Sequence, residues 1–381
     1  PPFPYKNKLG AKKMEDQPLE LEHIIGYTGN RQNTFHINPM DSSSLVYSIG
    51  STIVIGDVDD PHKQEFLRLH DAEISTLALS FNGAFLASGQ TGSKNHKSNE
   101  APIIVWDYKK RAKIYTLRSH VGGVKFIKFS PDNRFLLSVG EDRKFCIWDM
   151  ETGEISGGFR TEKEPPGFAS WCIAGLGRKT SYYIAVGFYN HVSVYDWTYS
   201  FKTMQYSLQG EICSVPGSGK GSGFLRSYKV STIDKYGKYC FAGNSSGEVL
   251  VFAIRSKVYR TTIQLSSNGI LSMVVGYSVS SSSEDDDEII LFCGAGDGKV
   301  KKIVGHDKKW KQVGECQLDG LVVSLSITAD GAEIVAGTSL GHQYRLLASD
   351  LSHQMIAESH TAAVTAVSFG NANEFFSTIS K

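Results

Sequence analysis

An internal repeat of short apolar segments constrains this chain more than any other feature of its sequence. Val124–Asp132 alternates apolar and polar residues before a turn, Phe135–Val139 has the composition of a buried strand, and Phe145–Asp149 ends a third strand with Trp and Asp. The same order recurs from Ile74 to Asp107. Strand units that recur about every 40 to 60 residues predict blades packed side by side, because one blade alone leaves an apolar face uncovered.

Weaker copies of the unit extend over the rest of the chain. They span residues 35–58, 168–197, 228–253, 270–304 and 321–348. An eighth copy begins at Val364 and is cut off at Lys381. Seven complete units predict an all-β fold, a seven-bladed β-propeller of four-stranded antiparallel blades, because a closed ring exposes no long sheet edge.

The repeat also sets the expected domain boundaries. Residues 1–18 are an N-terminal extension that is either disordered or foreign to the native protein, and residues 19–360 form the propeller. Residues 361–381 are the opening strands of a next blade, which we assign to a second propeller that is absent from this chain.

The dipeptides Trp106-Asp107 and Trp148-Asp149 resemble the signature of the WD40 repeat. In that family a His before the inner strand, a Ser or Thr on the second strand, an Asp in the following turn and the Trp on the third strand form a buried hydrogen-bonded network. The resemblance implies a structural role for the matching residues, which are His70, Ser88, Trp106, Asp107, His120, Ser138, Asp142, Trp148 and Asp149. Each partner satisfies a buried polar group that would otherwise cost about 1–3 kcal/mol.

Segments outside the repeat sharpen the resemblance. Leu19–Tyr27, Leu45–Ile55 and Gly337–Arg345 are similar to the cilia- and flagella-associated WD-repeat family found inside axonemal doublet microtubules, and the likeness spans most of the chain. The resemblance implies a scaffold that binds tubulin and neighbouring axonemal proteins, and a cytoplasmic location on the cytoskeleton of a cilium or flagellum. The family has two propellers in tandem, so contacts made by its second half cannot be carried over.

Charge and cysteine spacing exclude several classes of protein. With 40 Lys and Arg against 39 Asp and Glu, the formal net charge is +1, so no bulk field would draw the chain onto nucleic acid or an anionic membrane. The six cysteines are scattered singly, without the Cys-x-x-Cys spacing of zinc sites, as expected in a reducing compartment. No apolar run approaches the roughly 20 residues that span a bilayer, and residues 1–13 lack a signal-peptide core. We therefore expect a soluble intracellular protein.

Two ways of closing the ring are compatible with the sequence. Residues 19–26 have the pattern of an outer strand for blade seven, yet residues 353–358 already have that pattern. Either blade one packs directly on blade seven, or the N-terminal strand serves a second propeller. The tandem arrangement is the one we expect, and an outer strand formed by residues 19–26 in blade seven would exclude it.

Three polar insertions interrupt the repeat, at residues 91–101, 214–223 and 279–288. All three have the composition of solvated loops. The family geometry implies that the first two lie on one face of the disc and the third on the other. Lys94 and Lys97 in the first insertion mark that shared face as a candidate partner surface.

A second candidate surface is a basic patch around Trp310, predicted on the hairpin between the third and fourth strands of blade six. Its members are Lys299, Lys301, Lys302, Lys308, Lys309 and Lys311. Lysines beside an exposed aromatic ring suit an acidic protein surface such as tubulin, or a nucleic-acid backbone, although strand-edge lysines also serve simply to discourage edge pairing.

Sequence signals for chemistry fail on their spacing. Gly217–Ser222 lacks the earlier glycine and the following Ser or Thr of a phosphate-binding loop. Gly294, Gly296 and Gly298 resemble a dinucleotide-binding fingerprint, but Lys299 occupies the position of its last glycine. The acidic run Glu284–Glu288 lacks the alternation and glycine of a calcium loop. We expect no cofactor, no metal, no small-molecule substrate and no enzymatic activity.

The scaffold hypothesis keeps two alternatives. One is a soluble regulatory adaptor, such as a substrate receptor of a ubiquitin ligase, which would need recruitment segments beyond Lys381. The other is a propeller hydrolase, whose catalytic Ser, His and Asp would have to assemble from distant blades. Neither alternative has a positive signal in the sequence.

Overall fold

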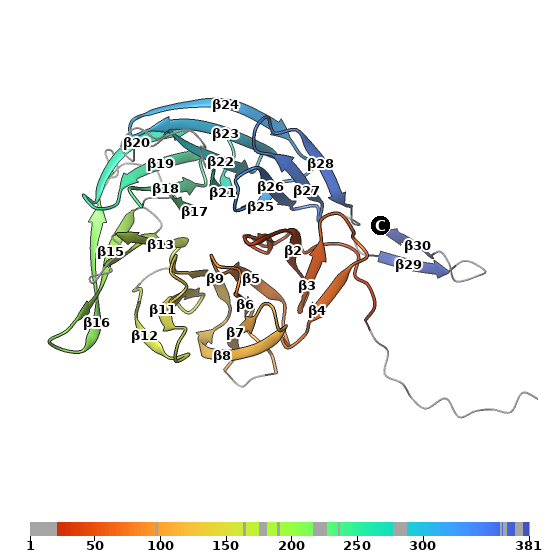
Figure 1. Cartoon of the computed structure of the whole chain (residues 1–381), viewed down its shortest axis with the longest axis horizontal. Coiled ribbons are helices and arrows are strands. Elements are labelled where there is room, and N and C mark those ends of the chain that lie inside the picture. The colour runs from red at the N-terminus through yellow and green to blue at the C-terminus, as the bar shows by residue number, and fades with distance from the viewer. Residues whose placement is uncertain are drawn as a thin grey trace, which may run out of the picture.

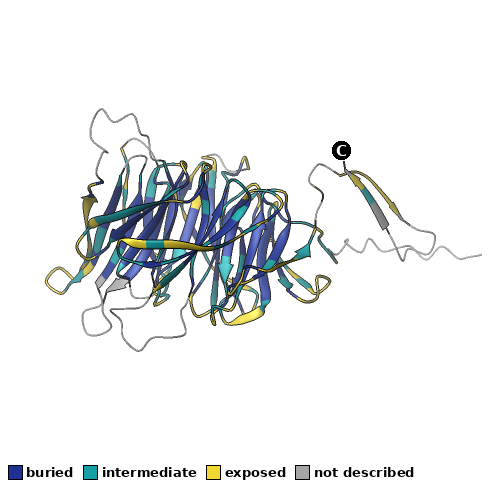
Figure 2. Ribbon diagram, turned by 90° about the horizontal axis from the view of Figure 1, so that it is seen from above, coloured by how far each residue is buried: buried dark blue, intermediate teal, exposed yellow. Residues whose placement is uncertain are grey.

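Seven four-stranded blades form a ring in the computed structural model of the chain (Figure 1). The structure describes residues 21–380 except for 96–97, 163–164, 175–180, 189–190, 216–226, 235–236, 277–287, 359, 361–363 and 370–375. Seen from the side, the ring is a flat disc with buried strands in its interior and exposed residues on its outer strands and turns (Figure 2). The predicted seven-bladed propeller is confirmed.

Each blade contains four consecutive antiparallel strands, and the first of them lies nearest the axis of the ring (Figure 1). The strands of blades one to four are β1 (Phe35–Asn38), β2 (Asp41–Ile49), β3 (Thr52–Asp57), β4 (Gln64–Leu67); β5 (Ile74–Leu79), β6 (Phe85–Gln90), β7 (Glu100–Asp107), β8 (Ala112–Val121); β9 (Val124–Phe129), β10 (Phe135–Gly140), β11 (Lys144–Asp149), β12 (Ile155–Arg160); β13 (Phe168–Ala174), β14 (Ser181–Gly187), β15 (Val192–Ser200) and β16 (Gln205–Cys213). The strands of blades five to seven are β17 (Tyr228–Ile233), β18 (Tyr239–Asn244), β19 (Glu248–Ala253), β20 (Val258–Gln264); β21 (Ile270–Gly276), β22 (Ile289–Ala295), β23 (Lys299–His306), β24 (Lys309–Gln317); β25 (Val322–Ile327), β26 (Glu333–Thr338), β27 (Gln343–Leu347) and β28 (His353–Ala357).

Burial decreases from the second strand of a blade to its outer strand. All six residues of β10 and of β18 are buried, because each has a strand on both edges and a neighbouring blade on both faces. The outer strand β24 is mostly exposed. Apolar clusters fill the seven seams between neighbouring blades, and so the core is a ring of interfaces.

The ring closes by direct packing of blade one on blade seven. The backbone N–H groups of Thr34 and Ile37 donate to the hydroxyls of Ser324 and Ser326, each at 3.3 Å. Blade seven has its own fourth strand, β28, as predicted, and the described residues 21–28 form no strand. Instead Tyr27 is buried in the seam, where its hydroxyl lies 3.0 Å from Thr34 Oγ1 and 3.4 Å from Ser324 Oγ.

The strands β29 (Val364–Phe369) and β30 (Phe376–Ser380) form a separate two-stranded sheet that stands away from the disc in both views (Figures 1 and 2). His360 Nε2 contacts the hydroxyl of Thr378, 18 residues further along the chain. Those two residues repeat the His and Ser pairing of complete blades, so the predicted start of an eighth blade is confirmed.

The described residues of the polar insertion in blade two, 92–95 and 98–99, belong to no strand. The insertion in blade two ends before Glu100, because β7 begins there and Ala101 pairs with His120 of β8. The other two insertions lie largely outside the described residues. Within the part of the chain that is described, no helix is long and apolar enough to cross a membrane.

Candidate functional site

A buried polar network joins blade three to the outer strand of blade two. His120, on β8, places Nε2 2.8 Å from Ser138 Oγ on β10, and Trp148 Nε1 on β11 donates to the same hydroxyl oxygen at 2.8 Å. His120 Nδ1 lies 3.1 Å from Asp142 Oδ1. Asp142 also accepts from the backbone N–H of Val121 at 3.2 Å, so the carboxylate holds the turn as well as the imidazole. The four residues predicted as a network are brought together.

Blade two has the same network with an amide in place of the carboxylate. His70 Nε2 lies 2.7 Å from Ser88 Oγ, which accepts from Trp106 Nε1 at 2.9 Å. His70 Nδ1 contacts Gln90 Oε1 at 2.6 Å, and Gln90 Nε2 donates to Asp71 Oδ1 at 2.7 Å. Sequence reasoning missed Gln90 and Asp71; the signal was a polar residue two positions after Ser88.

The aspartates of the two Trp-Asp dipeptides lie outside these networks. Asp107 accepts from the backbone N–H of Lys110 at 2.9 Å, and Asp149 accepts from that of Glu151 at 2.8 Å. Each therefore stabilises the turn that leads from the third strand into the fourth.

The two histidines have opposite pKa shifts. Burial lowers the pKa of His120, but hydrogen bonds to Asp142 and Cys146 and their charges outweigh it and raise the pKa to about 8. Burial also lowers the pKa of His70. The hydrogen bond to Gln90 and the charge of Asp71 raise it by less, so the pKa stays below its usual value. The carboxylate in blade three therefore keeps its histidine charged at neutral pH, and the amide in blade two does not.

The seam of blade three should weaken in mild alkali. Because the folded pKa of His120 exceeds its unfolded value of 6.5, its contribution is complete below pH 6.5 and is lost as the pH rises through about 8. Asp142→Asn should remove this dependence, which is on the order of 2 kcal/mol. Urea unfolding of both proteins from pH 6 to 9 measures the difference, and parallel curves for the two would contradict the prediction.

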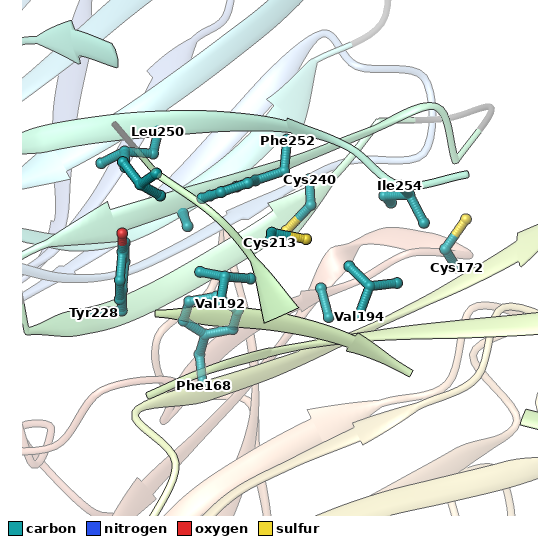
Figure 3. Close-up of a cluster of buried hydrophobic side chains, with 13 residues drawn as sticks. Phe168, Cys172, Val192, Val194, Cys213, Tyr228, Cys240, Leu250, Phe252 and Ile254 are labelled. Carbon is teal, nitrogen blue, oxygen red and sulfur yellow. The ribbon is translucent and has the colours of Figure 1, made fainter. Parts of the chain in front are cut away.

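Other seams are closed by apolar packing. Figure 3 shows the cluster between blades four and five, where Phe168 and Val192 face Tyr228 and Phe252. Three cysteines, Cys172, Cys213 and Cys240, are buried in the same cluster. Burial raises the pKa of Cys213 to about 11 and that of Cys172 to about 12, so these thiols are packing groups and not nucleophiles.

The antiparallel order assigns the loops to two faces of the disc. Turns between the first and second strands and hairpins between the third and fourth strands lie on one face, which we call the hairpin face. Turns between the second and third strands lie on the opposite face, with the connections between blades. Lys94 is exposed on that opposite face, and Lys97 lies outside the described residues. The two candidate surfaces are therefore on different faces of the disc.

The tip of the β23–β24 hairpin presents three exposed lysines, Lys308, Lys309 and Lys311, on the hairpin face. Within the described part of the chain none of them forms an ion pair. Trp310 is half-buried: its ring packs edge-on against Phe241 at 5.3 Å, and its Nε1 donates to the backbone oxygen of Asp307 at 2.9 Å. An open hollow of about 620 Å³ lies beside the tip and is lined by Glu288 and residues 304–311.

The structure removes three lysines from the predicted patch and corrects the expectation of an exposed tryptophan. Lys301 is buried, and its ammonium donates to the backbone oxygen of Leu265. Lys302 donates to the backbone oxygens of Ala348 and Ser349 in blade seven, each at 2.8 Å, and Lys299 pairs with Glu315 at 2.6 Å. These side chains hold the blade together or join it to the segment that follows blade five and to blade seven, because strand residues alternate in direction and some must point inward.

Sequence reasoning also missed an apolar point on the hairpin face. The β15–β16 hairpin ends in Phe201 and Met204, which are 72% and 70% exposed. Tyr199 packs against Phe201 at 5.2 Å and donates to Met204 Sδ at 3.5 Å. The available signal was two large apolar residues just beyond the predicted unit 168–197.

No group of three or more potential metal ligands occurs among the described residues. Gly298 lies in the tight turn between β22 and β23 with a positive φ of 79°, in agreement with a turn rather than a dinucleotide loop.

Comparison with known proteins agrees with this architecture. The family model described as WD domain, G-beta repeat matches residues 111–149, which contain the His120 network. The WD40 repeats of RRP9 share the fold, with a TM-score of 0.60 at 16% identity over 82% of this chain and 89% of that one.

Relatives of known name match nearly the whole chain. Cilia- and flagella-associated protein 52 of Chlamydomonas reinhardtii is 27% identical over 368 residues, and that of Homo sapiens is 25% identical over 374 residues. Each match covers 95% of this chain and 55% of the relative, so the chain spans about half the length of these proteins. The chain is a seven-bladed β-propeller that contains a match to the WD40 repeat and is similar over 95% of its length to the proteins named cilia- and flagella-associated protein 52.

Proposed function

We propose that this chain is a non-catalytic scaffold of the ciliary or flagellar axoneme, and that the tip of the β23–β24 hairpin docks on an acidic protein surface such as that of tubulin. The names of its relatives support the location. A propeller suits a scaffold, because repeated blades present broad and rigid surfaces. The proposal depends most on one observation, that the three lysines form no ion pair with any described residue and surround an indole that packing holds in place.

The lysines of this hairpin tip differ in their ion pairing from the basic residues of the β7–β8 hairpin. On the β7–β8 hairpin of blade two, Lys110 pairs with Asp107 at 3.3 Å and Arg111 pairs with Glu65 at 2.7 Å. Charges already neutralised within the chain attract a partner less than free charges do. Since the whole chain has a net charge of only +1, a local cluster must supply any attraction to an acidic surface.

Reversing the three tip charges should weaken microtubule binding. We expect the combined variant Lys308→Glu, Lys309→Glu and Lys311→Glu to bind at least about tenfold more weakly in co-sedimentation, equivalent to about 1.4 kcal/mol. The wild type should also lose affinity as salt is raised, because exposed charges are screened.

The matched control reverses Lys109, Lys110 and Lys113, which occupy the corresponding hairpin of blade two and are all exposed. An equal loss of binding in that control would show that the hairpin tip of blade six has no special role. Reversing Lys94 and Lys97 tests the opposite face in the same assay. Retention of the tagged chain in detergent-extracted axonemes tests the location, and recovery only in the soluble fraction would contradict it.

A further inference from the structure

The seven first strands, which surround the axis of the ring, carry positive charge and no acidic residue (Figure 1). The sequences of β1, β5, β9, β13, β17, β21 and β25 contain three lysines and one histidine but no Asp or Glu. In the chain as a whole the 40 basic and 39 acidic residues nearly balance. The centre of the ring is therefore locally cationic.

Lys128 extends from blade three into this centre. Its Nζ donates to Ser170 Oγ on β13 of blade four at 3.2 Å and to the backbone oxygen of Ser231 on β17 of blade five at 3.1 Å. Blades three and five are not neighbours in the ring, so a side chain of blade three can reach blade five only across the centre. The ammonium therefore lies inside the ring of first strands. The side chain keeps part of its surface accessible.

The ammonium of Lys128 has no carboxylate partner among the described residues. Burial lowers its pKa to about 8, with only a small opposing effect of Cys240. Lys257, also largely buried, lies instead 2.8 Å from Asp196 and 3.1 Å from Glu211. An ammonium has three donors, and the two bonds to Ser170 and Ser231 leave one of them for another acceptor.

Two hydroxyls stand beside this ammonium. Ser170 Oγ and Ser231 Oγ are 2.6 Å apart, and both serines are buried. His36 of blade one is near enough for Lys128 to influence its pKa, but its Nε2 already faces the backbone oxygens of Asn33 at 3.2 Å and Leu77 at 3.1 Å. The groups available to an incoming anion are therefore the third N–H of the ammonium and the Ser170–Ser231 hydroxyl pair, in which one hydroxyl donates to the other and one O–H remains free.

We infer that the centre of the ring binds a small oxyanion of the phosphate type, held by the ammonium of Lys128 and the hydroxyls of Ser170 and Ser231. A lysine is a common point-charge ligand for phosphate, and serine hydroxyls supply further donors. A bound anion neutralises a cation that has no carboxylate partner among the described residues, so it stabilises the folded chain.

The test is titration of the whole chain with sodium phosphate at pH 7, with sodium chloride keeping the ionic strength constant. Phosphate should raise the thermal unfolding midpoint and give a saturable isotherm in calorimetry. Lys128→Met keeps most of the aliphatic side chain and should bind phosphate at least tenfold more weakly. Ser170→Ala leaves the charge in place and should weaken binding about threefold, which keeps the test valid if the methionine variant does not fold.

Lys202→Met, at an exposed position on the β15–β16 hairpin, is the matched control and should bind phosphate like the wild type. A rise in midpoint that is the same for the Lys128 and Lys202 variants would overturn the inference. So would the absence of any phosphate effect on the wild type, or an equal effect of chloride.

Discussion

Replacing Phe135 by alanine is expected to lower the free energy of unfolding by about 3–5 kcal/mol, the range for removing a fully buried aromatic ring. Phe135 is 0% exposed and lies in the seam between blades three and four. Its ring centroid lies 5.2 Å from that of Tyr206, 5.4 Å from that of Tyr182 and 6.1 Å from that of Trp171. Rings on three strands of blade four would lose a common partner, and rigid strands cannot close the space.

Urea unfolding followed by tryptophan fluorescence measures this loss. Phe81→Ala is the control, because Phe81 is 59% exposed and its removal should change stability by no more than about 0.5 kcal/mol. A loss below about 1 kcal/mol for Phe135→Ala would show that the seam repacks around the missing ring.

The strand framework was predictable because its signals are local. Alternating apolar residues and turn residues, with Trp-Asp pairs in two blades, located the start of the first strand of every blade to within one residue. The His120 network was also predictable, since its four residues occupy fixed positions within one repeat. His360 and Thr378 in the added sheet have the same 18-residue separation as His120 and Ser138.

Features that depend on the closed ring were not predictable. The seam burial of Tyr27 depends on residues nearly 300 positions away, such as Ser324. Lys301 and Lys302 stand in a strand with lysines on both of its faces, and only the structure shows that one is buried and that the other bonds to blade seven. In blade two, Gln90 contacts His70 as Asp142 contacts His120 in blade three. The negative charge is on Asp71, which accepts a hydrogen bond from Gln90.

Removing the hydroxyl of Ser138 should destabilise the chain by about 2–6 kcal/mol, because the change leaves two buried donors without an acceptor at about 1–3 kcal/mol each. Ser138 Oγ lies 2.8 Å from His120 Nε2 and 2.8 Å from Trp148 Nε1. All three side chains are almost completely buried, so water cannot replace the lost contacts. Urea unfolding at pH 7 measures the effect of Ser138→Ala.

A double-mutant cycle separates the hydrogen bonds from simple packing. Ser138→Thr retains the hydroxyl and should keep most of the stability, as the pairing of His360 with Thr378 indicates. In a Trp148→Phe background the indole donor is already absent, and Ser138→Ala should therefore cost about 1–3 kcal/mol less than in the wild type. If the two effects instead add to within about 0.5 kcal/mol, the indole and the hydroxyl are not energetically coupled, and the bond between them contributes nothing to the seam.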